Sequence, residues 1–235
     1  MEISKLTKAF LPSTIITDLK TLTLPQASFM GLMLIIMVGL SVYWGDNTVG
    51  LLAGVTGVIC VFMVNMRKMS NFAWGLINSI LYGYVAYTAS YYGDVMLNWL
   101  FYLPVQLIGA YFWYDLLKED TITVRKISSV KTGIILVLLS ICTVLLYSSV
   151  LTYLGGALTL VDATTTTLSV LATFFMIKGF REQWVCWIII NILSIYMWVQ
   201  AVIGTGEGAG VLIMWIMFLM NSLYGAYNWF KYSEE

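Results

Sequence analysis

The sequence predicts an all-α integral membrane protein with eight transmembrane helices, and three observations lead to this prediction. Hydrophobic residues make up 60% of the 235-residue chain and charged residues only 10%, whereas a soluble domain carries about 25% charged residues. The apolar residues gather in stretches of about 20, the length that crosses a hydrocarbon core of about 30 Å. The basic residues fall between these stretches in an alternating pattern.

Eight apolar stretches are long enough to span a bilayer. They cover residues 26–45, 48–66, 71–92, 95–117, 131–153, 156–177, 183–203 and 209–230. The connections are short apart from the polar segment 118–130. The first 25 residues lack the charged start, the brief apolar run and the small-residue cleavage site of a signal peptide.

The basic residues orient the chain. With the N-terminus inside, all 12 Lys and Arg residues fall on the inner side, which is a strong positive-inside pattern. The outer connections carry Asp46, Asp94 and Glu207 instead. Both termini are therefore predicted to be cytoplasmic.

A repeat divides the chain into two similar halves. Trp99, Gly109 and Trp113 of the fourth stretch recur in register as Trp215, Gly225 and Trp229 of the eighth, and Trp74 and Asn78 of the third recur as Trp187 and Asn191 of the seventh. We therefore expect a 1+3+1+3 arrangement: residues 1–47 as an N-terminal lead and an extra helix, 48–117 as a first three-helix bundle, 118–155 as a cytoplasmic loop and linker helix, and 156–235 as a second bundle with a short cytoplasmic tail. Parallel repeats of this kind place a polar site at the repeat interface near the midplane.

Polar and aromatic side chains on the repeated helices mark the predicted site. Polar groups at membrane depth are costly and indicate either packing contacts or a pathway. The candidate substrate-binding residues are Trp74, Asn78, Tyr82, Gln106, Trp184, Trp187, Asn191, Ser194, Asn221 and Tyr224. Tryptophans near helix ends also serve as interfacial anchors, which is the preferred interpretation for Trp99, Trp113, Trp215 and Trp229. Membrane amides can also simply join helices.

The predicted lining favours a flat ring attached to a sugar. Aromatic faces attract apolar or cationic rings, and amides pair with another amide or with hydroxyl groups. Lys and Arg stay at the ends of the stretches and His is absent, so a phosphorylated solute has no cation to bind. The sequence predicts no cofactor, no metal site, no catalytic residue and no nucleic-acid partner.

Asp162 is the one candidate for coupling transport to an ion gradient. Coupled carriers place a carboxylate at membrane depth, but Asp162 lies near the outer end of its stretch, where a surface position is expected. Facilitated diffusion is therefore preferred, and a proton- or sodium-coupled vitamin symporter is the alternative. A membrane enzyme would need a nucleophile and a base, and a channel would show rings of charge; the sequence offers neither.

Three segments resemble one transporter family. Trp184-Val-Cys-Trp187-Ile-Ile-Ile-Asn191 reads WxxWxxxN, Asn221-Ser-Leu-Tyr224 follows in the last stretch, and Trp74-Gly-Leu-Ile-Asn78 comes earlier. Together they resemble the bacterial PnuC-type nicotinamide riboside transporters over about residues 48–232.

The resemblance implies a fold similar to that of SWEET carriers, with two three-helix bundles joined by a linker helix. It also implies a homotrimer in the bacterial inner membrane and facilitated diffusion of nicotinamide riboside, which a cytoplasmic kinase then phosphorylates and traps. The family motif assigns the ring and amide contacts to Trp184, Trp187 and Asn191. Thiamine and riboflavin remain open as substrates, because members of such families carry them.

Overall fold

The computed structural model describes residues 5, 7–118, 121–127 and 129–232. The long helices are α3 (Leu24–Tyr43), α4 (Thr48–Asn65), α5 (Asn71–Thr88), α8 (Val130–Tyr153), α9 (Thr159–Ile177), α10 (Gln183–Thr205) and α11 (Ala209–Tyr232). The fourth predicted stretch is a continuous unit of α6 (Tyr92–Met96), a π-helical segment (Leu97–Tyr102) and α7 (Leu103–Leu116). The short elements are a 3₁₀ turn (Lys8–Phe10), α2 (Pro12–Lys20), and the antiparallel pair β1 (Leu117–Lys118) and β2 (Thr121–Ile122).

The chain is a multi-pass membrane protein. Within the described residues, seven helical segments are long and apolar enough to cross a membrane: α3, α4, the α6–α7 unit, α8, α9, α10 and α11. The prediction of eight transmembrane helices is therefore supported for seven of them. The remaining candidate, α5, has 18 residues, and its Asn71, Asn78 and Ser79 lower its hydropathy.

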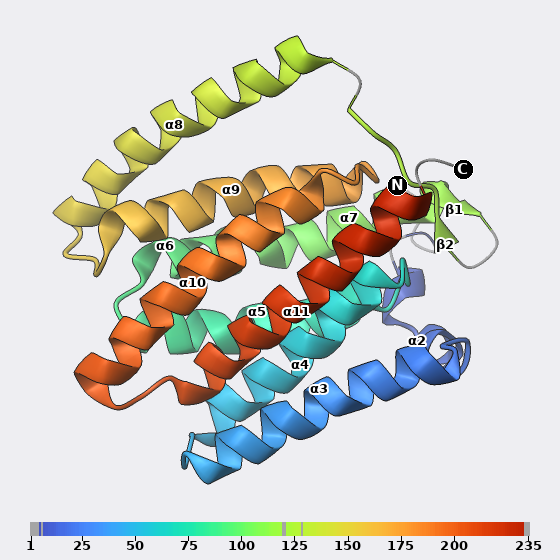
Figure 1. Ribbon diagram of the computed structural model, residues 1–235, viewed down its shortest axis with the longest axis horizontal. Helices are drawn as coiled ribbons and strands as arrows, with labels where there is room; N and C mark the ends of the chain where they lie inside the picture. The colour runs from blue at the N-terminus through green and yellow to red at the C-terminus, as the bar shows by residue number, and fades with distance from the viewer. Residues whose placement is uncertain (1–4, 6, 119–120, 128, 233–235) are drawn as a thin grey trace.

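Six helical segments pack in a closed ring, in which each contacts its two neighbours. Figure 1 shows them from the side, with α8 and α3 at opposite edges. Along one side α5 packs between α4 and the α6–α7 unit, and along the other α10 packs between α9 and α11. The two sides meet twice, where α11 contacts α4 and where α6 and α7 contact α9. Helix α3 covers α4 and α11 from outside, and α8 leans on α9 with most of its side chains exposed.

Two glycines of α4 allow close approach between helices. A Cβ atom at Gly54 would lie 1.9 Å from Met37 Cε of α3, and one at Gly57 would lie 2.8 Å from Asn78 Nδ2 of α5. Pro104 lies in the first turn of α7, directly after the π-helical segment. Proline has no N–H to donate to the preceding turn, and the helix widens just before it.

Two buried tryptophans make equivalent contacts between the two sides of the ring. Trp113 Nε1 of α7 donates to the carbonyl oxygen of Met176 in α9 at 3.3 Å, and Trp229 Nε1 of α11 donates to the carbonyl oxygen of Asn65 in α4 at 3.2 Å. Both side chains are 0% exposed. The prediction that they anchor the membrane interface is therefore wrong, because their neighbours across the ring enclose them. It is also wrong for Trp215, which is 7% exposed, whereas Trp99 is 38% exposed and stays at the surface.

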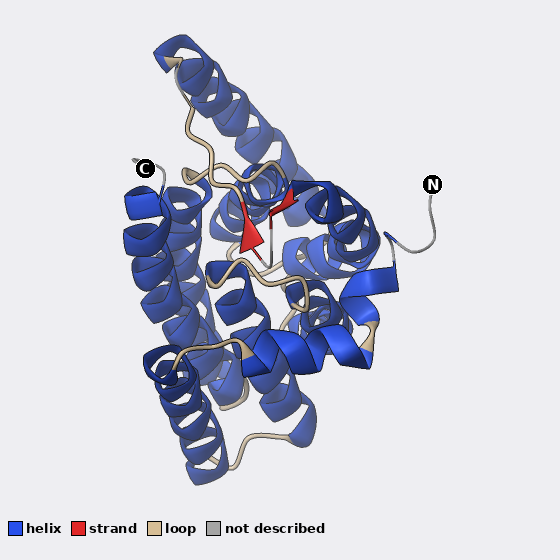
Figure 2. Ribbon diagram, turned by 90° about the vertical axis from the view of Figure 1, so that its right-hand side faces the viewer, coloured by secondary structure: helices blue, strands red, loops and turns tan. Residues whose placement is uncertain are grey.

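The end of the molecule that carries α2 and the β1–β2 hairpin is shown in Figure 2. There Asp18 Oδ2 of α2 accepts a hydrogen bond from the backbone N–H of Ser70 at 2.8 Å, just before α5 begins. Lys5 pairs with Asp115 at 2.7 Å at the same end. The parts of the predicted lead, loop and short tail that fall on residues 1–4, 6, 119–120, 128 and 233–235 lie outside the described residues.

Candidate functional site

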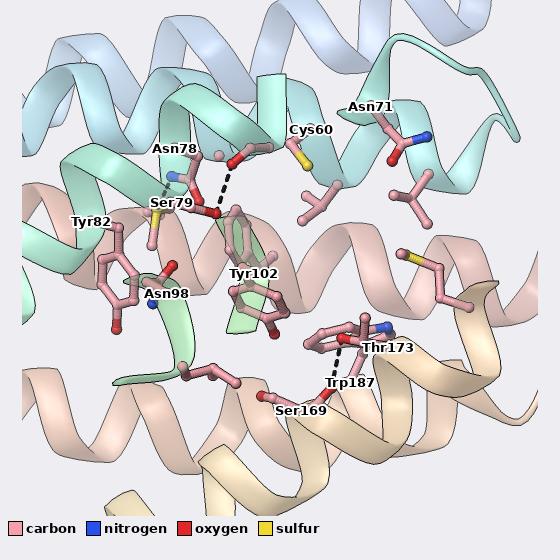
Figure 3. A pocket seen from close by; sticks show the side chains of 18 of the residues that line it. Cys60, Asn71, Asn78, Ser79, Tyr82, Asn98, Tyr102, Ser169, Thr173 and Trp187 are labelled. Atoms are coloured by element: carbon pink, nitrogen blue, oxygen red, sulfur yellow. Dashed lines mark hydrogen bonds between the residues drawn. The ribbon is translucent and has the colours of Figure 1, made fainter. Parts of the chain in front are cut away.

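A cavity of about 110 Å³ lies inside the helix ring. Side chains from α4, α5, the α6–α7 unit, α9, α10 and α11 line it, so both sides of the ring contribute (Figure 3). A space of this volume is larger than a single water site requires. Its position between the two sides matches the place where the sequence predicts a solute site.

The structure brings six of the ten predicted site residues to this cavity. They are Asn78, Tyr82, Gln106, Trp184, Trp187 and Asn191. All three positions of the WxxWxxxN motif are among them, because spacings of three and four on α10 place them on one face of the helix. Asn78 stands opposite on α5, the helix that the repeat pairs with α10.

The other four predicted residues lie away from the cavity. Asn221 is fully buried, and its Nδ2 donates to the carbonyl oxygen of Val61 at 2.9 Å, which joins α11 to α4. Tyr224 packs against Phe29 of α3, with ring centroids 5.2 Å apart. Ser194 is 1% exposed, and Trp74 is half-buried.

Further polar side chains line the cavity, and sequence reasoning missed all of them except Asn98, which it placed at the interface as either a helix-joining amide or a ligand contact. They are Cys60, Asn71, Ser79, Asn98, Tyr102, Ser169, Thr173 and Ser222. Ser79 and Thr173 donate to backbone oxygens one turn earlier, at 2.8 and 2.7 Å. Such bonds are common in membrane helices and give no sign of a site. The spacing of four between Ser169 and Thr173 was the one available signal that both face the same way.

Hydrogen bonds fix the orientation of the lining amides. Asn191 Nδ2 of α10 donates to Ser222 Oγ of α11 at 2.8 Å, and Asn78 Nδ2 of α5 donates to the carbonyl oxygen of Ala53 in α4 at 2.8 Å. A side chain held in this way is already ordered, so it loses little further rotamer entropy when its remaining polar atoms bind a ligand.

Aromatic rings and a carboxylate close the cavity at one end. Tyr82 lies 6.0 Å from the rings of both Trp198 and Trp215. Its hydroxyl donates to Asp94 Oδ2 and accepts a hydrogen bond from Trp198 Nε1, the latter at 3.2 Å. These contacts link α5, α6 and α10.

Two acidic residues expected at the outer surface are buried. Asp94 is 3% exposed and belongs to α6, and Asp162 is 0% exposed, so the surface prediction for Asp162 is wrong. The backbone N–H of Gly93 donates to Asp162 Oδ2 at 2.9 Å. The sequence gives no sign of this contact, because Gly93 and Asp162 come from different sides of the ring.

The lining can bind a flat polar molecule. In the part of the chain that the structure describes, Asp94 is the one Asp, Glu, Lys or Arg among the lining residues, and no cluster of three potential metal ligands occurs. The indole N–H groups of Trp184 and Trp215 are buried without a hydrogen-bond partner within the described residues. A buried donor without an acceptor is costly, so both are candidate donors to a bound molecule.

Comparison with known proteins points in the same direction. Residues 47–231 match a family model described as nicotinamide mononucleotide transporter. The nicotinamide riboside transporter PnuC of Neisseria mucosa is 38% identical over 209 residues, which cover 86% of this chain and 78% of that protein. The nicotinamide riboside transporter PnuC of Haemophilus influenzae is 33% identical over 209 residues, which cover 88% of this chain and 89% of that protein.

A solved structure has the same fold. It is described as the crystal structure of the vitamin B3 transporter PnuC, and it superimposes with a TM-score of 0.81 at 32% identity over 100% of this chain and 99% of that one. These similar proteins are named as transporters, which agrees with the prediction that the chain is not an enzyme.

Proposed function

The chain belongs to the family of PnuC nicotinamide riboside transporters, and on that basis we propose that it carries nicotinamide riboside across the membrane by facilitated diffusion. The observation that carries the proposal is the cavity inside the helix ring, where Trp184, Trp187 and Asn191 of the WxxWxxxN motif meet residues of the opposite side. Residues far apart in the sequence thus converge on one site of suitable chemistry.

The lining suits each part of the riboside. The pyridinium ring matches the aromatic faces of Trp184 and Trp187, because ring faces attract cations. Its carboxamide matches the amides of Asn78, Gln106 and Asn191, each of which offers donors and an acceptor. The ribose hydroxyls match the Ser and Thr hydroxyls of α5 and α9.

The same lining favours the riboside over its phosphorylated form. The family model carries the description of a mononucleotide transporter, whereas the similar PnuC proteins are named for the riboside. Among the described residues no Lys or Arg lines the cavity, and a buried phosphate needs charge-assisted donors. A mononucleotide would moreover meet the carboxylate of Asp94.

The proposed architecture has eight spans in a 1+3+1+3 order, in which α5 is counted as a span in addition to the seven long apolar segments. Helices α4, α5 and α6–α7 form the first bundle, and α9, α10 and α11 form the second, with α8 as linker and α3 as the extra helix. The equivalent bonds of Trp113 and Trp229 support this arrangement, since each joins the last helix of one bundle to the first of the other. Transport then proceeds by alternating access, with the bundles rocking about the cavity.

The cellular setting follows from the family and from charge. We place the chain as a homotrimer in the bacterial inner membrane, with both termini in the cytoplasm. Lys5 and Arg181 lie with the β1–β2 end of the molecule, where Lys5 pairs with Asp115 and Arg181 packs on Phe230 near the end of α11. A cytoplasmic riboside kinase would remove the free substrate and keep the gradient inward.

Binding calorimetry on the purified chain tests the substrate. We expect nicotinamide riboside to bind, and nicotinamide mononucleotide, thiamine and riboflavin to bind at least about tenfold more weakly. Trp187→Ala should weaken riboside binding about 30-fold, the effect of losing a desolvated cation–π contact of about 2 kcal/mol. Asn191→Ala should weaken it as well.

The matched control is Trp44→Ala, because Trp44 is 52% exposed and does not line the cavity. Tight binding of thiamine or riboflavin would leave the proposed site in place but show that the substrate is a different vitamin. Riboside binding that survives both Trp187→Ala and Asn191→Ala would place the substrate elsewhere.

A proton- or sodium-coupled symporter is the second candidate, and the burial of Asp94 and Asp162 favours it. Carboxylates at membrane depth are the groups that coupled carriers use. Uptake into proteoliposomes with and without a pH or sodium gradient separates the two mechanisms. With the membrane potential held at zero, facilitated diffusion predicts the same final concentration of the cationic riboside inside and outside under every gradient. Accumulation that Asp162→Asn abolishes would establish coupling.

A further inference from the structure

Asp94 is the one Asp, Glu, Lys or Arg residue that lines the cavity among the residues described. We propose that Asp94 determines the preference of this cavity for a positively charged ring over a neutral ring of the same shape. The inference rests on the proposed riboside substrate and adds a specificity-determining residue that lies outside the WxxWxxxN motif.

A chain of hydrogen bonds leads to this carboxylate. Trp198 Nε1 donates to the hydroxyl oxygen of Tyr82 at 3.2 Å, which leaves the hydroxyl proton of Tyr82 for Asp94 Oδ2. A buried carboxylate needs such donors. They also fix its position at the cavity wall, so it can act on a ligand without first reorganising.

The surroundings of Asp94 strengthen its effect on a cation. Its side chain is 3% exposed, so little water screens it, and charges interact much more strongly in such a site than in bulk water. The ring of Tyr82, next to it, lies 6.0 Å from that of Trp215 at an interplanar angle of 73°. Aromatic faces are themselves the negative part of a ring. This end of the cavity therefore presents two features that favour positive charge.

Nicotinamide riboside has the matching property, a permanent positive charge on its ring nitrogen. Benzamide riboside has nearly the same shape, but a carbon atom replaces that nitrogen and the ring is neutral. The ratio of the two affinities measures charge recognition alone, because the contacts to the amide and the ribose are common to both ligands.

Asp162 provides a matched control. It is buried, like Asp94, and it contacts the neighbour of Asp94, since its Oδ2 accepts the backbone N–H of Gly93 at 2.9 Å. It does not line the cavity. Asp162→Asn therefore removes a second carboxylate from the same region of the fold and leaves the carboxylate of Asp94 and the other lining side chains in place.

The experiment is titration calorimetry of both ribosides on the full-length chain in detergent. We expect wild type to bind the cationic riboside about tenfold or more tightly than the neutral one. Asp94→Asn should reduce this preference to about threefold or less, whereas Asp162→Asn and the charge-conserving Asp94→Glu should keep it. A thermal unfolding curve for each variant shows that it is folded.

Two results would overturn the inference. One is a wild type that binds both ribosides equally, a result that needs no variant. The other is an Asp94→Asn protein that keeps the full preference. Failure of the proposed function looks different, because wild type would then bind neither riboside.

Discussion

Replacing Trp229 by alanine should destabilise the fold more than most single substitutions. The side chain is 0% exposed, packs against Trp184 with ring centroids 5.9 Å apart, and donates its indole N–H to the carbonyl oxygen of Asn65 at 3.2 Å. Truncation of a buried Trp to Ala costs about 3–5 kcal/mol through lost contacts and the cavity that remains. The lost hydrogen bond, worth about 1 kcal/mol, is contained in that total.

The effect converts into a measurable change in thermal stability. For a chain of 150–250 residues, 1 kcal/mol shifts Tm by about 2–4 °C, so Trp229→Ala should lower Tm by about 6–20 °C. Trp229→Phe keeps a ring but removes the donor and should lower it by a few degrees. The assay is the fraction of detergent-solubilised protein that stays monodisperse in size-exclusion chromatography after heating.

The repeat predicts that the equivalent residue, Trp113, contributes similarly to stability. Trp113 donates to Met176 at 3.3 Å and packs edge-on against Phe72, with centroids 5.1 Å apart, so Trp113→Ala should lower Tm by a similar amount. The exposed Trp44→Ala is the control and should change Tm by about 2 °C or less. A Trp229→Ala protein as stable as this control would refute the argument, and a loss in only one of the two variants would refute their equivalence.

Three further predictions concern other contacts. Gly225→Ala should lower Tm, because a Cβ atom at Gly225 would lie 2.6 Å from the ring of Trp184. Gly39→Ala should not lower it, because a Cβ atom at Gly39 would meet no other atom within 4 Å. Asn65→Ala should cost about 1–3 kcal/mol in chemical unfolding, because the buried amide of Asn221 and the half-buried amide of Asn228 each lose a hydrogen-bond partner. Burial raises the pKa of Asp46 in the outer connection, so its ionisation opposes folding; wild type should gain stability as pH falls from 7 through that pKa, and Asp46→Asn should gain less than wild type.

The helices could be predicted from the sequence because length and hydropathy control them in a membrane. The boundaries of α8, Val130–Tyr153, agree with the predicted stretch 131–153 almost to the residue. The polar α5 was also expected, and its Asn78 was assigned to the site because the repeat pairs it with Asn191. Both residues line the cavity, so the repeat drew attention to positions that hydropathy alone would have obscured.

Contacts across the ring could not be predicted, because they join residues far apart in the chain. Asp162 was placed at the surface from its position near a helix end, but Gly93 of another helix covers it. Tyr224 was assigned to the site, but it packs on Phe29 of α3, a helix outside the repeat. A face that looks free within the repeat can be occupied by the element that the repeat does not contain.

The reciprocal tryptophan bonds have a consequence for how such a chain can arise. In the proposed arrangement, a single three-helix unit that pairs with a second copy of itself would already make both contacts, once in each direction, as in a two-fold homodimer. Duplication and fusion of its gene would then require no new interface. Three spans leave the end of the first unit on the opposite side from its start, so fusion does require one added crossing. Helix α8 provides it, and its largely exposed surface is what is expected of a segment whose task is to return the chain rather than to bind.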